Sequence, residues 1–229
     1  MDIVIKVCTN EYYVKNRGGE KMQVFYDSRQ IPSDKSLTGN KKYSDLLYGY
    51  LQVVSEREEG TNIRYIDKKN LKFTKIAADL QISRQTVASR LNNLIDMGLL
   101  KYDEVKKRYE FITIQKDLAA LLPKPTVRIL CNTLRERSLS ILAYLLKSYF
   151  QHGQKPFNIN IDVLKAQVGL SSANRGTNNE VITDTLILLK KLGFIDYKVV
   201  KEMDKVSGGF KTVYILLSVD NYIDWTGGI

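Results

Sequence analysis

The chain has 229 residues, with 35 Lys and Arg against 25 Asp and Glu, and so carries a formal net charge of +10 at pH 7. This balance favours a polyanionic partner, such as a nucleic acid or an acidic membrane surface. No apolar run reaches the roughly 18 residues of a membrane-spanning helix, and the N-terminus lacks the basic-then-apolar pattern of a signal peptide. We therefore expect a soluble, cytoplasmic protein.

The basic charge is concentrated in the first part of the chain. Residues 1–133 hold 23 Lys and Arg against 16 Asp and Glu, whereas residues 134–229 hold 12 against 9. We expect the first part to contribute more of the attraction to a phosphate backbone.

The N-terminal segment consists of short apolar or alternating runs. Residues 3–8, 12–15 and 22–26 are typical of strands, with Gly18 and Gly19 in a turn. A helix is expected over about 43–57, followed by a short strand over 63–66. Its core positions are Leu46, Leu47, Tyr50, Leu51 and Val54.

The stretch from Lys72 to Leu100 has the pattern of a helix-turn-helix. Thr74 is the expected side-chain cap of the first helix, and residues 81–83 form the turn. Ser83 is a preferred N-cap for the second helix, which Gly98 ends as a left-handed C-cap. The buried stripe of the second helix is Val87, Leu91, Leu94 and Ile95.

The outer face of the second helix carries residue types that hydrogen-bond base edges and phosphates. The candidate DNA-binding residues of this motif are Thr74, Ser83, Arg84, Gln85, Thr86, Ser89, Arg90 and Asn93. They gather toward the N-terminal half of the helix, which enters the major groove in this motif. The alternative is an amphipathic helical hairpin that binds no DNA.

A basic hairpin follows the second helix. Residues 99–102 and 109–114 are typical of strands, and the turn between them contains Lys106, Lys107 and Arg108. A helix-turn-helix followed by such a hairpin is a winged helix. We expect the three basic residues to reach the adjacent groove or the DNA backbone, the alternatives being a solvated turn or a winged helix used only for protein contacts.

The first part of the chain resembles a known family. The resemblance rests on Phe25-Tyr26, Ile31-Pro32, Leu46-Leu47-Tyr48-Gly49, Phe73, the helix that begins after Ser83, and Gly98-Leu99. Over roughly residues 24–113 the chain is similar to the N-terminal winged-helix domain of plasmid replication initiators of the RepA_N type. The resemblance implies recognition of repeated double-stranded sites at a replication origin, with host replication proteins as further partners. The remaining chain differs from the helical C-terminal domain of that family.

Residues 114–137 are expected to connect two domains. An apolar helical turn over 118–122 precedes Pro123 and Pro125, which are typical of a stiff linker. The expected domains are residues 1–122, a β segment plus a winged helix, and residues 123–229, a second winged helix.

The first part of the chain is repeated after Ser138. At an offset of 95, Ile141, Leu142, Leu145, Leu146 and Tyr149 match Leu46, Leu47, Tyr50, Leu51 and Val54. At the same offset, Ile182, Leu186, Leu189, Leu192 and Gly193 match Val87, Leu91, Leu94, Met97 and Gly98. We therefore expect an α+β, mainly helical fold of tandem winged helix-turn-helix domains, with strands over 194–200 and 212–217 around a second wing. The alternative is an unrelated helical domain after the first winged helix.

The two repeats differ in the turn of the helix-turn-helix. Between the two matched blocks the offset falls to 88, so the second turn is expected to be seven residues longer, over 172–178. The candidate DNA-binding residues of this repeat are Arg175, Asn178 and Asn179. Glu180 and Asp184 would repel phosphates, so we expect a weaker DNA contact or a protein contact, such as self-association.

The residues needed for common catalytic and metal sites are missing. His152 is the only histidine, which excludes a paired-histidine metal site. Its expected role is a C-terminal helix cap, so we do not expect it to belong to a Ser-His-Asp arrangement. Cys8 and Cys131 lack metal-ligand spacing and are expected to be reduced core thiols. Glu56, Glu58 and Glu59 are expected on a solvated helix end. We expect no enzymatic activity, no cofactor and no metal.

The leading hypothesis is a sequence-specific double-stranded DNA-binding protein that initiates or controls plasmid replication. A transcriptional or DNA-transfer regulator would use the same chemistry at a different target site. A third hypothesis, from another class, is a winged-helix adaptor that docks a replication factor such as a helicase.

Overall fold

The computed structural model describes residues 6–8, 11–15, 21–24, 27–170, 175–203 and 208–220. Helices and antiparallel strands are mixed along this part of the chain, so the fold is α+β. Within it, no helix combines the length and the apolar content that a bilayer span would need. The three expected N-terminal strands are confirmed as β1 (Lys6–Cys8), β2 (Glu11–Lys15) and β3 (Lys21–Val24), which pair in that order. The Gly18–Gly19 turn lies outside the described residues.

The first half contains the expected helices and a small sheet. Its elements are β4 (Ser28–Pro32), α1 (Lys35–Thr38), α2 (Asp45–Val54), β5 (Glu56–Arg57), β6 (Arg64–Asp67), the 3-10 helix η1 (Lys68–Asn70), α3 (Phe73–Asp79), α4 (Arg84–Asp96), β7 (Leu100–Asp103) and β8 (Arg108–Phe111). The antiparallel sheet has the order β5-β6-β8-β7. Helix α2 ends three residues earlier than expected because Ser55 turns into extended backbone before β5, and Val54 is exposed rather than in the core.

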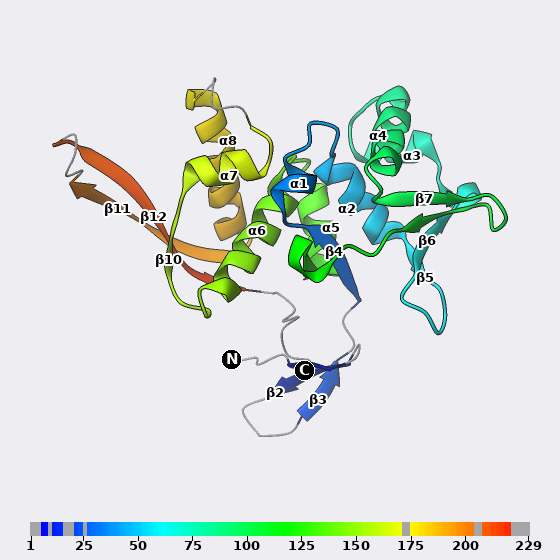
Figure 1. The fold of residues 1–229 in the computed structure, drawn as a ribbon, viewed down its shortest axis with the longest axis horizontal. Coiled ribbons are helices and arrows are strands. Elements are labelled where there is room, and N and C mark those ends of the chain that lie inside the picture. Colours follow the sequence, from blue (N-terminus) through cyan, green and yellow to red (C-terminus); the bar gives the residue numbers. More distant parts are fainter. Residues whose placement is uncertain are drawn as a thin grey trace.

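The second half repeats this succession of elements. Its elements are α6 (Ser138–Gln151), β10 (Phe157–Ile159), α7 (Ile161–Gln167), α8 (Arg175–Lys191), β11 (Ile195–Met203) and β12 (Phe210–Val219). The sheet order β10-β12-β11 matches the order β6-β8-β7 of the first half. Gly98 and Gly193 follow α4 and α8 with φ of 69° and 72°, so both helices end on the expected left-handed glycine. The two hairpins extend from opposite ends of the molecule (Figure 1).

The prediction of a linker over residues 114–137 is wrong, because this segment is part of the packed core. Residues 119–123 form strand β9 (Ala119–Pro123), which pairs antiparallel with β4, after the 3-10 helix η2 (Lys116–Leu118). Helix α5 (Lys124–Asn132) follows directly. Pro123 closes the short strand, and Pro125 lies in the first helical turn, where its missing N–H leaves no helical hydrogen bond unmade. The prolines therefore join two regular elements.

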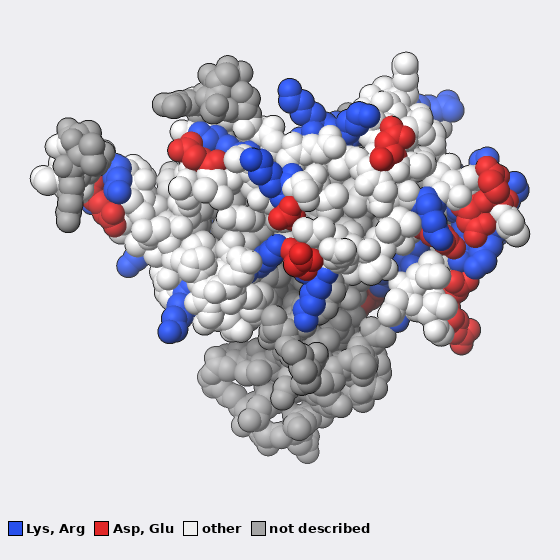
Figure 2. Space-filling model, in the orientation of Figure 1, with Lys and Arg blue, Asp and Glu red and all other residues white. Residues whose placement is uncertain are grey.

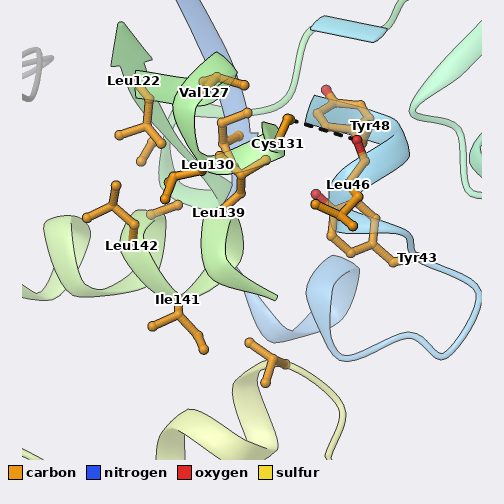
Figure 3. Packing of buried hydrophobic residues seen from close by; sticks show 14 of the residues in the cluster. Tyr43, Leu46, Tyr48, Leu122, Val127, Leu130, Cys131, Leu139, Ile141 and Leu142 are labelled. Carbon is orange, nitrogen blue, oxygen red and sulfur yellow. Dashed lines mark hydrogen bonds between the residues drawn. The ribbon is translucent and has the colours of Figure 1, made fainter. Parts of the chain in front are cut away.

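Helices α2, α5 and α6 lie at the centre of the molecule (Figure 1), and Figure 3 shows buried side chains that pack between them. Gly49 permits this close approach, because a Cβ there would lie 2.3 Å from Cδ1 of Leu139 and 2.8 Å from Sγ of Cys131. The Cys131 thiol is buried and free, as expected, and donates to the Leu46 carbonyl at 3.9 Å. The buried apolar side chains of both halves form one continuous cluster.

The N-termini of α2 and α6 exchange capping groups. The Asp45 carboxylate of α2 accepts from the backbone N–H of Leu139 at 2.8 Å and of Ser140 at 3.1 Å, and from the Ser140 hydroxyl. In return, Glu136, which precedes α6, accepts from the Ser44 hydroxyl at 3.1 Å and from the Leu46 N–H at 3.4 Å. Each carboxylate satisfies donors that the other helix leaves unpaired at its start. We call Ser44, Asp45, Glu136 and Ser140 the capping junction.

Asp45 makes folding stability depend on pH. Burial raises the pKa of its carboxyl to about 6, although the hydrogen bonds from Ser140 act to lower it. A carboxyl with a raised folded-state pKa stabilises the protein below its unfolded pKa of about 4, and this contribution is lost as pH rises through the folded pKa. Asparagine does not titrate, so Asp45→Asn lacks this pH dependence. As pH rises from about 4 to about 7, we expect the unfolding free energy of the protein to fall by roughly 2 kcal/mol more than that of the variant. Urea unfolding across pH measures this difference; parallel pH profiles would contradict it.

Candidate nucleic-acid interface

Helix α4 is held firmly at the edge of the first half. The Ser83 hydroxyl caps it by accepting from the Thr86 N–H at 3.0 Å, as expected. The expected Thr74 cap is wrong: α3 begins at Phe73, its N-cap position is Lys72, and no side chain caps it. Gln81 turns the chain between the helices with a φ of 53°. Val87, Leu91 and Leu94 are buried, so the opposite side of α4 faces outward.

The first turns of α4 present polar side chains to solvent. Arg84, Gln85 and Ser89 are exposed, and Thr86 is half-buried with its hydroxyl 2.8 Å from that of Ser83. Among the described residues, none forms an ion pair with Arg84 or a hydrogen bond with the Gln85 side chain. Both side chains are therefore available to a ligand without first breaking an internal contact. Asn93, two turns further on, is half-buried.

Arg90 does not project outward with the other candidate residues. Its guanidinium contacts Glu136 at 2.6 Å and the Ser44 hydroxyl at 3.0 Å. The residue therefore ties α4 to the capping junction. The helical period predicted Arg90 on the outer face of α4. The ion pair could not be predicted, because Glu136 lies 46 positions away in the sequence.

The basic turn between β7 and β8 is only partly as expected. Lys106 and Lys107 lie in the turn and are exposed, but Arg108 is the first residue of β8 and is only 6% exposed. Its guanidinium donates to Glu110 at 2.8 Å and to Glu58 at 3.1 Å, and it stacks over the Tyr65 ring. Arg108 is thus a structural cation inside the hairpin, because two neighbouring carboxylates draw it inward.

Carboxylates also accompany the two exposed lysines of this hairpin. Lys106 lies 3.1 Å from Glu58, and Lys107 lies 3.1 Å from Glu104. Figure 2 shows Lys and Arg intermixed with Asp and Glu over this end of the molecule. Glu58 is in the turn after β5, not on a helix end as expected. The hairpin therefore presents a weaker positive surface than its three consecutive basic residues suggested.

Three further lysines join the candidate surface. Lys72 and Lys75 flank the start of α3, are exposed, and form no ion pair with any described residue. The ammonium of Lys68, in η1, lies 5.3 Å from the centre of the Tyr102 ring, and the backbone N–H of Lys68 donates to the Lys107 carbonyl at 3.0 Å. Lys68 therefore lies against the β7–β8 hairpin, and Lys72 and Lys75 add exposed positive charge at the start of α3. Their signal in the sequence is the basic run KKNLKFTK, which precedes α4 and so lies outside the pattern of its outer face.

In the second half, α8 takes the place of α4 but offers different groups. It begins at Arg175, so residues 175–178 of the expected seven-residue turn are helical, while residues 171–174 lie outside the described part of the chain. Asn178 is half-buried and Asn179 is exposed. Asp184 contacts Arg135 at 3.7 Å, and Lys190 contacts Asp196 at 2.7 Å. The exposed groups of α8 are thus not predominantly basic.

His152 ends α6, as expected. Its Nδ1 lies 2.7 Å from the Ser148 carbonyl, which accepts from the ring N–H, and the ring stacks on Phe157 with centroids 4.4 Å apart. Within the described ranges, no three His, Cys, Asp or Glu side chains gather as metal ligands would.

The chain matches no family model and no curated protein sequence.

Arg108 and Lys107 are expected to have separate roles. Arg108→Ala would remove one of the two cations that contact the buried Glu110 and leave only Lys101, at 2.8 Å, so we expect a loss of about 2 kcal/mol of unfolding free energy. Lys107→Ala removes an exposed charge and should change stability by less than about 0.5 kcal/mol. Chemical unfolding compares the two variants. Equal, small losses would contradict the structural role of Arg108.

Proposed function

We propose that this is a cytoplasmic, non-enzymatic protein that recognises specific double-stranded DNA sequences through tandem winged helices, and that it initiates or controls plasmid replication. The observation that carries the proposal is the Ser83-capped start of α4, where Arg84 and Gln85 are exposed, with Ser89 exposed one helical turn later. Arg and Gln side chains are suited to base edges in the major groove, where the start of a recognition helix is inserted.

The repeated succession of elements supports the architecture. In each half a helix and a strand precede two helices and an antiparallel hairpin, and the three equivalent strands have the same order. This is the order of a winged helix. Residues 1–122 and 123–229 would then be two winged-helix units that share one core.

The first unit supplies most of the attraction to DNA in this proposal. Arg84, Lys72 and Lys75 are exposed without ion pairs to described residues, and Lys68 contacts Tyr102 and Lys107 of the hairpin. Phosphate contacts by such side chains position the helix, and contacts to bases determine the sequence that is read. The second unit, in which Arg175, Asn178 and Asn179 are candidates, would add a weaker contact.

Selection from a pool of random duplexes tests this proposal. We expect one preferred sequence, bound with an affinity whose logarithm falls against the logarithm of salt concentration with a slope on the order of −5, from about five to six phosphate contacts. A binding free energy independent of salt, or a preference for single strands, would contradict the proposal. A selected site repeated at a replication origin would favour initiation, and a site at a promoter or transfer origin would favour a regulator.

Gln85→Ala tests base recognition. If Gln85 binds a base edge, the variant should lose about 1 to 3 kcal/mol on the selected duplex and much less on a scrambled duplex. Gln115→Ala is the matched control, because Gln115 is also exposed but lies before η2. Fluorescence anisotropy gives both affinities. Equal losses on the two duplexes would reassign Gln85 to the DNA backbone.

Arg90 is expected to act as a positioning residue, through Glu136 rather than through DNA. Arg90→Gln and Glu136→Gln should each weaken binding to the selected duplex by about 1 kcal/mol, and the double variant should lose no more than either single variant. Neither should change the salt slope. If Arg90 contacts a phosphate instead, only the Arg90 variant will weaken binding, and it will reduce the slope by about one unit.

A second candidate function is an adaptor that docks a host replication protein. It is favoured for the second unit by the exposed carboxylates of Glu180 and Asp184 on α8, where a DNA-reading helix would need neutral or basic groups. Loss of partner binding but not of DNA binding on reversal of these two charges would support it.

A further inference from the structure

The β11–β12 hairpin has one edge that is unpaired among the described strands. The sheet order is β10-β12-β11, so β11 lies at the edge and no described strand pairs with its other side. At nine residues, β11 is long for an edge strand, and its unpaired backbone groups form a template for another strand.

Two facts identify which backbone groups point to the free side. The Lys190 ammonium donates to the Tyr197 carbonyl at 2.6 Å, so this carbonyl points away from β12. Alternate residues of a strand direct their N–H and C=O groups to opposite sides. From Tyr197 onward the register with β12 is regular. The backbone N–H and C=O groups of Val199, Lys201 and Met203 therefore also point to the free side, away from β12.

An apolar strip runs along one face of the same hairpin. Tyr197 is buried, and on the same face Val199 and Met203 are 51% and 66% exposed, with the exposed Lys201 between them. Opposite Met203 on β12, Phe210 is 74% exposed. The strip therefore continues the face that packs on the helices, but it extends beyond the helices of its own half.

We propose that a second copy of this chain pairs antiparallel with β11, on a two-fold axis at Val200. In this register Lys198 of each copy lies opposite Glu202 of the other, which gives two cross-strand pairs of opposite charge. An axis at Val199 would instead oppose Asp196 to Glu202, and an axis at Lys201 would oppose Lys201 to itself. Charge complementarity therefore selects Val200 among the three central positions.

The pairing also covers the apolar strip. With the axis at Val200, Met203 of one copy lies opposite Tyr197 of the other, on the face that the helices cover. The exposed tip, Met203 with Phe210, then reaches the folded body of the second copy. Val199 and Lys201 supply the hydrogen-bonding groups of the new ladder, and the two three-stranded sheets become one.

Charge reversal tests the proposal on the full chain, without DNA and independently of the proposed function. Sedimentation velocity over a range of protein concentrations should show a dimer. Lys198→Glu and Glu202→Lys each replace two attractive pairs with two repulsive ones, so each should raise the dimer dissociation constant about tenfold or more. The double variant restores opposite charges at both positions and should restore the dimer, and a mixture of the two single variants should form mixed dimers.

Two controls separate pairing from misfolding and from net charge. Lys155→Glu makes the same charge change in the exposed loop before β10 and should leave the dimer intact. Lys201→Pro removes an N–H that faces the free side, a position that tolerates proline at an edge. It should abolish the dimer while the circular dichroism spectrum stays unchanged.

Several results would overturn the proposal. One is a protein that stays monomeric at all concentrations, and another is a dimer that is insensitive to Lys198→Glu. A double variant as weak as the single variants would also overturn it. If sedimentation is unaffected while Lys198→Glu weakens and Glu202→Lys strengthens DNA binding, the hairpin is a DNA contact and not an edge for a second copy.

Discussion

The fold depends on the exchange of capping groups between α2 and α6. Asp45 satisfies the start of α6, and Glu136 satisfies the start of α2, so neither helix can move without exposing unpaired donors in the core. Arg90 extends the same network to α4. Because burial of the Asp45 carboxylate is costly, it is compensated by donors fixed on the opposite half. The orientation of α4 thus depends on residues of both halves.

Much of the first half could be predicted from local sequence. Ser83 and Gly98 mark the ends of α4, and the buried positions between them follow the helical period. The repeat of these positions after Ser138 predicted the second set of elements. The segment around Pro123 was predicted wrongly because β9 is a strand only through its pairing with β4, whose residues lie more than 80 positions earlier. Such a pairing leaves no pattern in the segment itself.

The sequence predicted correctly those site residues whose exposure follows from the helical period alone. Arg84 and Gln85 face solvent because Val87 and Leu91 face the core. The sequence could not show that Arg90 and Arg108 are engaged by Glu136 and by Glu58 with Glu110, since ion pairs between distant segments depend on the tertiary fold. A basic residue in such a motif can therefore be assigned to DNA only after the structure shows that no carboxylate of the protein already binds it.

The two halves use the same succession of elements for different surfaces. The first presents exposed Arg and Lys around α3 and α4, and the second presents mixed charges on α8 and an edge of β11 that no described strand pairs with. The central claim is that the start of α4 contacts DNA. Photocrosslinking of the full chain to its selected duplex, with halogenated pyrimidines across the site and crosslinked peptides identified by mass spectrometry, tests this claim most directly. Crosslinks within residues 81–93 are the predicted result, and crosslinks confined to α8 or to the β11–β12 hairpin would contradict it.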